Sequence, residues 1–420
     1  MPFVAPPLAE PVAGMGDAMK IACVGGGPAG LYFSILAKLS NPQHDVTIIE
    51  RNPPGVTYGW GVVFWDDLLR DLQRNDPVSA REIAAEACRW DTQEVHLRGQ
   101  MATRIGAYGF SLGRDRLLEI LTRRAKGLGV HLRYQCDVQD LSAFADVDLI
   151  VACDGVNSRL RQQHASHFQP QVQEGRNQYI WLGTDKVFDA FTFAFEETSA
   201  GWLWFHAYRF NAETSTCIVE CQQETWDALG FATMGPEETL RKLEDIFKSR
   251  LAGHSLFNQL RGLGKAPWLH FKRITNERWY HDKVVLMGDA AHTTHFSIGS
   301  GTKLAIQDAI GLARQLRAHD HLPTALQAYE EERRAALVAI QLAARHSSEW
   351  FENVPGDVDQ SATSFAHALL NRRGSSVWSY LLLLASQRPA LRGVLRGLHA
   401  SRRWVRAQQN GRETTLPARR

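Results

Sequence analysis

Apolar and polar positions near the front of the chain follow the pattern of a β-α-β unit. Residues 21–24 are an apolar run that leads into three glycines, residues 31–39 repeat apolar positions at helical spacing, and residues 46–49 are a second apolar run. A short apolar run bounded by turn signals is typical of a buried strand, whereas apolar positions three and four apart are typical of a helix. We therefore expect a strand, a tight turn, a helix and a second strand between residues 19 and 51.

The pattern changes between residues 178 and 221. Runs of aromatic and β-branched residues follow one another at short spacing there, as in an antiparallel sheet. A helix is expected over 236–251, and a buried strand of the first kind returns at 284–287. Helices are then expected over 303–316, 324–350, 365–370, 378–385 and 390–398. This order predicts one α/β domain with a second domain inserted into it.

Length and cysteine usage set outer limits. A chain of 420 residues is long enough to form two or three domains, each with a buried core. The first 18 residues are rich in Pro, Ala and Gly and lack the basic start and apolar core of a signal peptide, so we interpret them as a flexible leader. No apolar run approaches the length of a membrane span. The six cysteines are scattered without a C-x-x-C pair, which predicts neither a zinc site nor a disulfide framework and fits a reducing, cytoplasmic setting.

Charge is distributed unevenly. Residues 361–420 hold eleven Arg and one Glu, with no Lys or Asp, so this segment carries +10 in a chain of net charge +2 and leaves −8 on the rest. The segment is either a solvated helical face with a frayed end or a surface that attracts an anionic substrate or partner. No nucleic-acid motif accompanies it.

The glycines after the first strand carry the clearest chemistry. Gly25, Gly27 and Gly30 fit G-x-G-x-x-G, the loop that places a pyrophosphate on a helix N-terminus. We expect the turn at Gly25, close backbone approach to phosphate at Gly27 and tight helix–strand packing at Gly30. Glu50 ends the second strand, twenty residues after Gly30, where an acid can bind a ribose hydroxyl pair. These residues together predict a dinucleotide site.

Two later strand ends point at the same ligand. Residues 147–153 run into Asp154 and Gly155, and residues 284–287 run into Gly288 and Asp289. A glycine loop at 299–302 then precedes a helix, whose N-terminus would stabilise a redox ring that becomes anionic on reduction. FAD is long enough to reach from the first site to the last, and two separate ligands are the less economical interpretation. Arg114 lies in the first turn of an expected helix, where a cation is disfavoured, which suggests that it meets an anion.

At these residues the sequence resembles the FAD-dependent aromatic hydroxylases of the p-hydroxybenzoate hydroxylase fold. The family's three motifs occur in order, as G-x-G-x-x-G at 25–30, Asp-Gly at 154–155 and Gly-Asp at 288–289. The resemblance covers most of residues 19–360. It implies an α/β protein with a Rossmann-like FAD-binding domain, an inserted antiparallel β-sheet substrate domain and an α-rich C-terminal cap.

We place the domain boundaries accordingly. The FAD-binding domain would comprise residues 19–75, 104–175 and 268–360, and the substrate domain residues 76–103 and 176–267. Residues 1–18 would be the leader and residues 361–420 a basic helical C-terminal segment.

The resemblance also implies which residues bind the cofactor. The glycine loop and Glu50 would hold the ADP half, Arg114 would meet the flavin side, and Asp289 would bind the ribityl chain or the pyrophosphate region. Asp154-Gly155 is associated in the family with both FAD and NAD(P)H use. The expected cofactor-binding residues are Gly25, Gly27, Pro28, Ala29, Gly30, Glu50, Arg51, Arg114, Val138, Asp154, Gly288, Asp289, Gly299, Ser300, Gly301 and Thr302. No metal site is expected.

One departure from the family pattern narrows the resemblance. The family commonly has a proline pair after Gly-Asp-Ala-Ala-His, and here the matching positions are His295 and Phe296. This version resembles a subgroup that includes salicylyl-CoA 5-hydroxylase, the monooxygenase part of anthraniloyl-CoA monooxygenase and the tryptophan-derivative hydroxylase of violacein biosynthesis. The stretches at 371–373 and 388–390 favour the members that act on CoA esters.

The subgroup implies a monooxygenase with tightly bound, non-covalent FAD that uses NAD(P)H and O2. Transient NAD(P)H would reduce the flavin, and a flavin C4a-hydroperoxide would then transfer oxygen to an electron-rich aromatic ring. The protein's part would be positioning, exclusion of water and electrostatics. An aromatic acyl thioester such as salicylyl-CoA is the expected substrate. The alternatives are a free or indolic aromatic substrate, a flavin reductase that inserts no oxygen, and a non-enzymatic flavin-binding module.

Candidate catalytic and substrate-binding residues follow from position. His295, beside the glycine loop at 299–302, could hydrogen-bond the substrate, act as an acid or base, or be structural. His206 and Tyr208 share one strand face, which either lines the pocket or does not. Trp60, Phe64 and Trp204 could sandwich an aromatic ring or belong to the core. Arg372 and Arg373 are expected to hold a CoA or acyl-carrier-protein group. The sequence leaves open NADH or NADPH, and a monomer or a homodimer.

Overall fold

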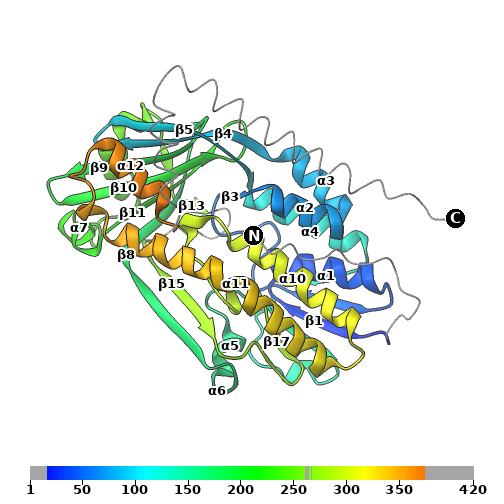
Figure 1. Cartoon of the computed structure of the whole chain (residues 1–420). Helices are drawn as coiled ribbons and strands as arrows, with labels where there is room; N and C mark the ends of the chain where they lie inside the picture. The colour runs from blue at the N-terminus through cyan, green and yellow to red at the C-terminus, as the bar shows by residue number, and fades with distance from the viewer. Residues whose placement is uncertain (1–16, 261–263, 266, 374–420) are drawn as a thin grey trace.

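The glycine-rich turn joins the first strand and helix of a six-stranded sheet. The computed structural model describes residues 17–260, 264–265 and 267–373 (Figure 1). The strand order is β16-β17-β7-β1-β2-β6, parallel except at the β16 edge. The strands are β1 (Lys20–Val24), β2 (Asp45–Ile49), β6 (His131–Arg133), β7 (Leu149–Ala152), β16 (Tyr280–His281) and β17 (Val284–Leu286). The β-α-β unit expected between residues 19 and 51 is confirmed.

Helices cover this sheet, and α1 packs directly against β1 and β2. Helix α1 buries ten of its thirteen residues and packs on α10 and α4. Helices α2 and α3 pack on each other beside α4. The bounds are α1 (Pro28–Ser40), α2 (Asp66–Asn75), α3 (Pro77–Glu86), α4 (Arg114–Gly127), α5 (Arg159–Gln163), α6 (Ala165–Phe168), α10 (Gly301–Ala318) and α11 (Leu322–Glu352).

A larger sheet forms the other half of the molecule (Figure 1). Its strands run in the order β12-β8-β11-β10-β9-β4-β5-β3, with β15 also pairing β8; neighbours are antiparallel except β4 and β9. The strands are β3 (Gly61–Phe64), β4 (Cys88–Leu97), β5 (Gln100–Gly113), β8 (Pro170–Thr184), β9 (Phe191–Thr198), β10 (Gly201–Arg209), β11 (Ser215–Cys221), β12 (Leu256–Phe257) and β15 (Leu269–Asn276). A separate two-stranded sheet pairs β13 (Gln259–Leu260) with β14 (Gly264–Lys265).

Several elements differ from the expectation. Residues 61–64 and 269–276, which the sequence places in the cofactor domain, are strands of the larger sheet, and helix α3, placed in the substrate domain, packs with α2 and α4. The short strands expected around 94–97 and 106–110 belong to one long hairpin, β4–β5, with register shifts at Trp90/Thr92 and Val95/His96. Such shifts break the two-residue alternation on which a strand prediction rests.

The two faces of the larger sheet have different neighbours. The outer face, from Ile180 on β8 to Val219 on β11, packs under the helices α7 (Gln223–Ala228), α8 (Pro236–Ile246) and α9 (Lys248–Leu251). The sequence predicts a single helix over 236–251, whereas the structure has two helices there, α8 and α9. The inner face carries Phe195 and Trp204 and packs on the ends of α11 and of α12 (Ala362–Asn371).

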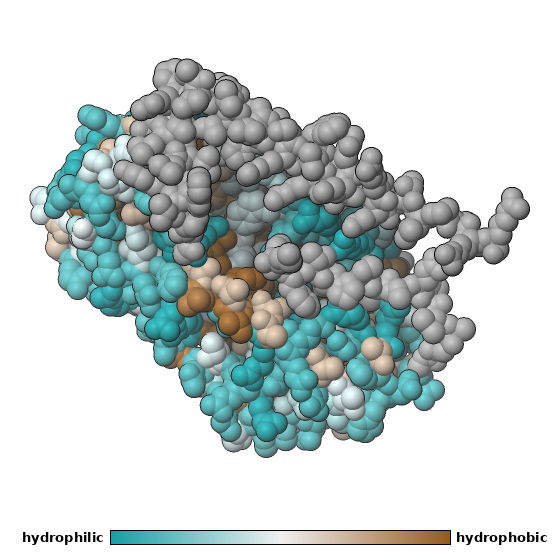
Figure 2. Space-filling model, viewed as in Figure 1, coloured by the Kyte–Doolittle hydropathy of each residue, from teal (hydrophilic) through white to brown (hydrophobic). Residues whose placement is uncertain are grey.

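Helix α11 crosses from the smaller sheet to the larger one (Figure 1). The hydrophobic residues seen in the middle of this face lie between the two halves (Figure 2). Helix α12 confirms the expectation for 365–370; the expected helices at 378–385 and 390–398 and most of the leader lie outside the described residues. In the described part of the chain, no helix has a stretch both long and apolar enough to span a bilayer.

Candidate functional site

Three loops with cofactor signatures meet at one edge of the smaller sheet. Strands β1, β7 and β17 are parallel neighbours, so their carboxyl ends lie side by side. The loops that follow begin at Gly25, Asp154 and Gly288. Ligands of open α/β sheets bind outside the carboxyl ends of the strands, which makes this edge the candidate cofactor site.

The three glycines of the first loop have separate physical reasons. Gly25 has φ +118°, and a Cβ added there would lie 2.3 Å from the carbonyl oxygen of Cys153. A Cβ on Gly30 would lie 2.3 Å from the carbonyl oxygen of Gly25, so helix and loop pack too closely for a side chain. A Cβ on Gly27 would meet nothing within 4 Å. The open side of Gly27 is where a phosphate could approach the backbone.

The N-terminus of α1 is available to an anion. Its N-cap is Gly27, which supplies no side-chain cap, and Pro28 occupies the first turn. The Glu50 carboxylate accepts from the backbone N–H of Gly26 at 2.7 Å and from Asn52. Pro28, Ala29 and Gly30 are buried in this turn, whereas Arg51 is exposed and Val138 is half-buried near β6. Glu50 therefore lies directly beside the loop, as the dinucleotide pattern predicts.

The second loop is tied to the third. Asp154 Oδ2 accepts from the backbone N–H of Arg159 at 2.8 Å, while its Oδ1 is buried without a partner among the described residues. Gly155 has φ +84°, and a Cβ there would meet nothing within 4 Å. The buried Arg161 guanidinium donates to the carbonyl of Ala290 at 3.1 Å, which joins the two loops.

Asp308 holds the third loop from behind. This fully buried carboxylate accepts from the backbone N–H of Gly288 at 3.1 Å and from Arg333 at 2.8 Å. His292 Nε2 lies 2.8 Å from the same carboxylate, and its ring stacks on Trp279. The nearby cations hold the pKa of Asp308 below its usual value despite burial. The turn that carries Asp289 is thus fixed by α10 and α11.

Asp289 and Arg114 interact electrostatically at this edge of the sheet. The Asp289 side chain is exposed although its neighbours Gly288 and Ala290 are buried, and removal from bulk water raises its pKa against the opposing charge of Arg114. Arg114 begins α4; burial lowers its pKa while Asp289 raises it, and its Nε is buried without a partner among the described residues. An orphaned guanidinium donor fits the anion that its helix position suggested.

Residues 295–302, which we call the flavin loop for the role that the resemblance implies, lead into α10. Gly299 has φ +64° and packs on Val63 and Trp65, whereas a Cβ on Gly301 would meet nothing within 4 Å. Ser300 is the N-cap of α10 without a side-chain cap bond; its hydroxyl lies 3.0 Å from that of Thr294. Thr302 follows in the first turn. The open glycines, two uncapped helix N-termini and orphaned polar atoms fit a long anionic dinucleotide such as FAD.

The inner face of the larger sheet lies against the flavin loop. His206 on β10 packs its ring 4.9 Å from Phe193, 4.8 Å from Phe351 and 5.7 Å from Phe296. Tyr179 on β8 lies 4.8 Å from Phe296, and burial raises its pKa to about 12. The strand face of His206 therefore lies against the flavin loop.

Both candidate histidines are neutral in this setting. Burial lowers the pKa of His206 well below its usual value, and His206 Nε2 has no partner among the described residues. Burial lowers the pKa of His295 to about 3, with Arg372 adding to the effect. A histidine with this pKa is not a proton donor at neutral pH, which disfavours the acid–base role considered for His295 and leaves hydrogen bonding.

Glu220 is a buried carboxyl on the same face. It accepts from Asn177 Nδ2 at 2.8 Å and from Trp204 Nε1 at 3.0 Å, and burial raises its pKa to about 7. Sequence reasoning missed Glu220, although an acid in the otherwise apolar-rich strand 215–221 is a detectable signal. It also missed Phe351, Ser347 and Asp308, which approach the site only through the packing of α10 and α11.

The other candidates on the sheet side are mostly structural. Phe64 and Trp204 are fully buried; Phe64 stacks on Phe110, and Trp204 packs between Phe195 and Phe351. The Tyr208 hydroxyl donates to the carbonyl of Gly61 at 2.9 Å, and burial raises its pKa further above neutrality. Trp60 is half-buried and packs over Gly183.

Arg372 and Arg373 end α12 beside the flavin loop. Arg372 is buried and donates to Ser347, to the carbonyl of Leu369 and to the carbonyl of Ser297. Arg373 is exposed and donates to the same Ser297 carbonyl at 3.0 Å. Of these two arginines, Arg373 is thus the one open to a carrier phosphate.

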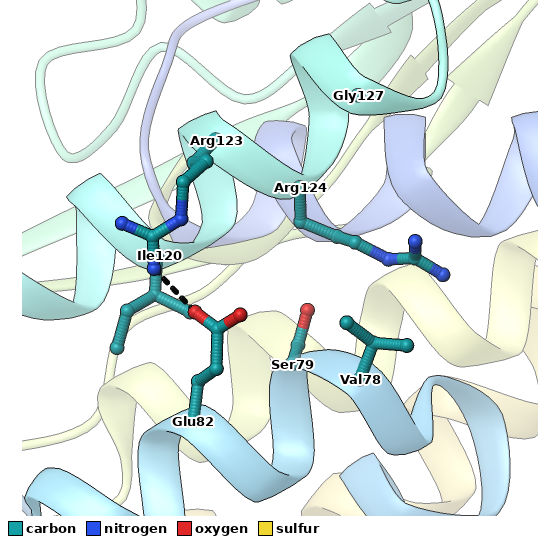
Figure 3. A pocket seen from close by; sticks show the side chains of 7 residues that line it. All are labelled: Val78, Ser79, Glu82, Ile120, Arg123, Arg124 and Gly127. Atoms are coloured by element: carbon teal, nitrogen blue, oxygen red, sulfur yellow. Dashed lines mark hydrogen bonds and ion pairs between the residues drawn. The ribbon is translucent and has the colours of Figure 1, made fainter.

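A surface pocket of about 250 Å³ lies between α3 and α4, apart from these loops (Figure 3). Its charges are paired internally, Arg123 with Glu82 and Arg124 with Asp76. We assign it no ligand.

Comparison with known proteins supports FAD as the cofactor. The family model described as "FAD binding domain" matches residues 101–344. The salicyloyl-CoA 5-hydroxylase of a Streptomyces species is 39% identical over 366 residues, covering 84% of this chain and 70% of the relative. The 3-hydroxy-4-methyl-anthranilyl-[aryl-carrier protein] 5-monooxygenase of Streptosporangium sibiricum is 34% identical over 379 residues, covering 89% of this chain and 100% of the relative.

A solved structure supports the fold. A crystal structure of 2-methyl-3-hydroxypyridine-5-carboxylic acid oxygenase superposes with a TM-score of 0.65 at 18% identity, covering 85% of this chain and 96% of that one. This likeness confirms the fold class expected from the sequence.

Proposed function

The chain belongs to the FAD-dependent aromatic hydroxylases, and on that premise we propose that its substrate is an aromatic acyl thioester carried on CoA or on a carrier protein. The observation that carries the proposal is the pair of relatives that cover most of this chain. One is named for a CoA-linked and the other for a carrier-protein-linked aromatic group.

The enzyme is a monooxygenase that uses FAD, NAD(P)H and O2. When bound, FAD supplies the redox chemistry and the activation of oxygen. The loops at the strand ends would hold it. The backbone amides at Gly27 and at the start of α1 would bind the pyrophosphate, and Glu50 would bind a ribose. Asp289 and Arg114 would bind the part nearer the flavin. The α10 N-terminus would stabilise negative charge on the reduced ring.

The substrate ring would lie between the flavin loop and the inner sheet face. Tyr179, Phe296 and Phe351 offer aromatic contacts there, and their packing around a bound ring would exclude water. His206 and His295, both neutral, can hydrogen-bond polar substituents of the ring or the thioester oxygen. His206 Nε2 would gain the partner it lacks among the described residues.

The carrier group would meet basic residues. Arg373 is exposed at the end of α12, and residues 361–420 carry +10. Phosphates of CoA, or the acidic surface of a carrier protein, would be attracted to them. The six free cysteines fit a reducing cytoplasm, and we expect a monomer or a homodimer.

A product assay tests the substrate class. The FAD-loaded enzyme is given NADH or NADPH with salicylyl-CoA, anthraniloyl-CoA, free salicylate or a tryptophan-derived indole, and the products are identified by mass spectrometry. We expect one added oxygen on a thioester. Preferred hydroxylation of the free acid or the indole would contradict the proposal, and NAD(P)H oxidation without oxygenated product would indicate a reductase.

Substitution of Arg373 tests its contact with the carrier group of the substrate. Arg373→Ala should raise KM for the thioester and leave KM for NAD(P)H unchanged. Equal kcat/KM for the thioester in variant and wild type would remove Arg373 from the site.

A further inference from the structure

Arg372, Ser347, Ser297 and His295 form one continuous chain of hydrogen bonds. Arg372 Nε donates to Ser347 Oγ at 3.0 Å. Ser347 Oγ lies 2.7 Å from Ser297 Oγ, which lies 2.7 Å from His295 Nδ1. The four side chains come from α12, α11 and the flavin loop, and all four residues are buried.

The chemistry of the groups fixes the direction of this chain. A guanidinium only donates, so Ser347 must accept from Arg372. The Ser347 hydroxyl is fully buried and has no other acceptor among the described residues, so its hydrogen points to Ser297. The opposite arrangement would leave a buried donor unpaired, at a cost of about 1–3 kcal/mol. Ser297 must then donate to His295.

His295 Nδ1 is therefore an acceptor. The backbone N–H of Ser297 points at the same nitrogen at 3.4 Å, which a protonated Nδ1 would oppose. The ring proton is thus on Nε2, for which the described residues provide no hydrogen-bond partner. The imidazole lies between Phe271 and Phe296, beside the space assigned to the substrate.

We propose that Arg372 is a positioning residue that acts through Ser347 and Ser297 to hold His295 as the Nε2–H tautomer, ready to donate to an oxygen of the substrate. The substrate oxygen rests on the proposed function; the tautomer does not. The surroundings of Arg372 favour this role, because it has no ion pair among the described residues and lies 5.2 Å and 5.3 Å from the ring centres of Phe193 and Phe351. Burial lowers the pKa of His295 to about 3, which keeps its ring neutral.

Histidine NMR on the FAD-loaded enzyme tests the proposal without substrate. With ¹⁵N-labelled histidine, wild-type His295, assigned by its loss in His295→Asn, should show a protonated Nε2 and an unprotonated Nδ1. In Arg372→Gln the amide can accept as well as donate, so the chain can reverse and a population with protonated Nδ1 should appear. Arg372→Lys keeps a donor-only group and should keep the wild-type tautomer.

Two further variants complete the test. Ser347→Ala cuts the chain without touching Arg372 and should release the tautomer in the same way, which covers a failure of Arg372→Gln to fold. Arg345→Gln is the control. It removes an exposed arginine that lies on α11, the helix of Ser347, and pairs with Glu349, and it should leave the His295 signals unchanged. Protonated Nδ1 in the wild type, or an unchanged tautomer in both Arg372→Gln and Ser347→Ala, overturns the proposal.

Kinetics separate this proposal from the substrate class. On whichever aromatic substrate the enzyme hydroxylates, Arg372→Gln should lower kcat/KM about tenfold, and Arg372→Lys should restore most of it. If no thioester is hydroxylated while the tautomer responds as predicted, the substrate class fails and the positioning role stands. If a thioester is hydroxylated and the tautomer does not respond, only the positioning role fails.

Discussion

The two ends of the site are built from different kinds of contact. At the glycine loop the contacts are made by the backbone. Gly25 and Gly30 lie too close to carbonyl oxygens to carry a side chain, and Gly27 has open space beside it. At the inner sheet face the contacts are made by side chains. Glu220, His206 and Tyr179 come from three strands, and Phe351 comes from a helix distant in sequence. The first end offers generic anion binding, and the second offers shape and selected hydrogen bonds.

The difference teaches where each end tolerates change. A backbone site fails when a side chain is added, because φ and space are already committed. A side-chain site keeps its fold when a polar atom is replaced by one of similar shape, and its chemistry changes instead. The predictions below test this contrast, from the largest expected effect to the smallest.

Gly25→Ala should unfold or strongly destabilise the protein, whereas Gly27→Ala should not. At Gly25 the new Cβ would lie 2.3 Å from a carbonyl oxygen, with φ at +118°. We expect a loss of about 3 kcal/mol or more from strain and overpacking. Thermal unfolding of the two variants measures it.

At Gly27 the Cβ would enter open space on the side of the phosphate. We expect stability near that of the wild type and FAD affinity lowered about a hundredfold, or ~2.7 kcal/mol, by flavin fluorescence titration. Equal stability of the two variants would contradict the different roles assigned to the two glycines.

Glu220→Gln should remove a pH dependence of stability. Burial raises the pKa of folded Glu220 to about 7 from an ordinary 4.5, so the folded state binds more protons than the unfolded state between these values. Stability is therefore lost as pH rises through that window, by on the order of 3 kcal/mol. Urea unfolding at pH 5 and pH 8 should show this loss in the wild type and not in the variant.

The structure makes this variant conservative. A glutamine can accept from Trp204 and donate to Asn177 once the Asn177 amide rotates, and Asn177 Oδ1 now has no partner among the described residues. Destabilisation at pH 8 relative to the wild type would mean that the carboxyl stays ionised in the fold.

His206→Leu should lower activity while leaving the fold intact. His206 Nε2 is buried without a partner among the described residues, so its removal costs no hydrogen bond within them. We expect unchanged or slightly higher stability and kcat/KM lowered about tenfold, from loss of a hydrogen bond to the substrate. Phe205→Leu is the matched control, because Phe205 is the next residue and packs on the outer face. Phe205→Leu should lower stability and leave kcat/KM of the folded enzyme unchanged. If instead Phe205→Leu lowered kcat/KM and His206→Leu lowered only stability, the roles assigned to the two faces would be wrong.

The same contrast explains what the sequence can predict. The glycine spacing, Glu50 and the two later strand ends are local signals, because strand, turn and helix follow one another within a few residues. They sufficed for the fold class and for the cofactor. Glu220, Ser347 and Phe351 become neighbours only when α11 packs on the larger sheet, and no local pattern encodes that packing. The membership of β3 and β15 in the larger sheet was hidden for the same reason, since pairing partners lie far apart in the sequence.

Tyr208→Phe should have the smallest effect. The Tyr208 hydroxyl donates to the carbonyl of Gly61, which joins β10 to β3 and so supports the loop that carries Trp60. Burial raises the pKa of this hydroxyl above its usual value, so it holds its proton at neutral pH and is unsuited to proton transfer. Loss of one buried hydrogen bond should cost about 1 kcal/mol, and kcat/KM should stay within about threefold of the wild type. Denaturant unfolding and steady-state kinetics measure the two effects. A hundredfold fall in kcat with unchanged stability would contradict a structural role for Tyr208. It would show that this face of the sheet supplies a proton-transfer group.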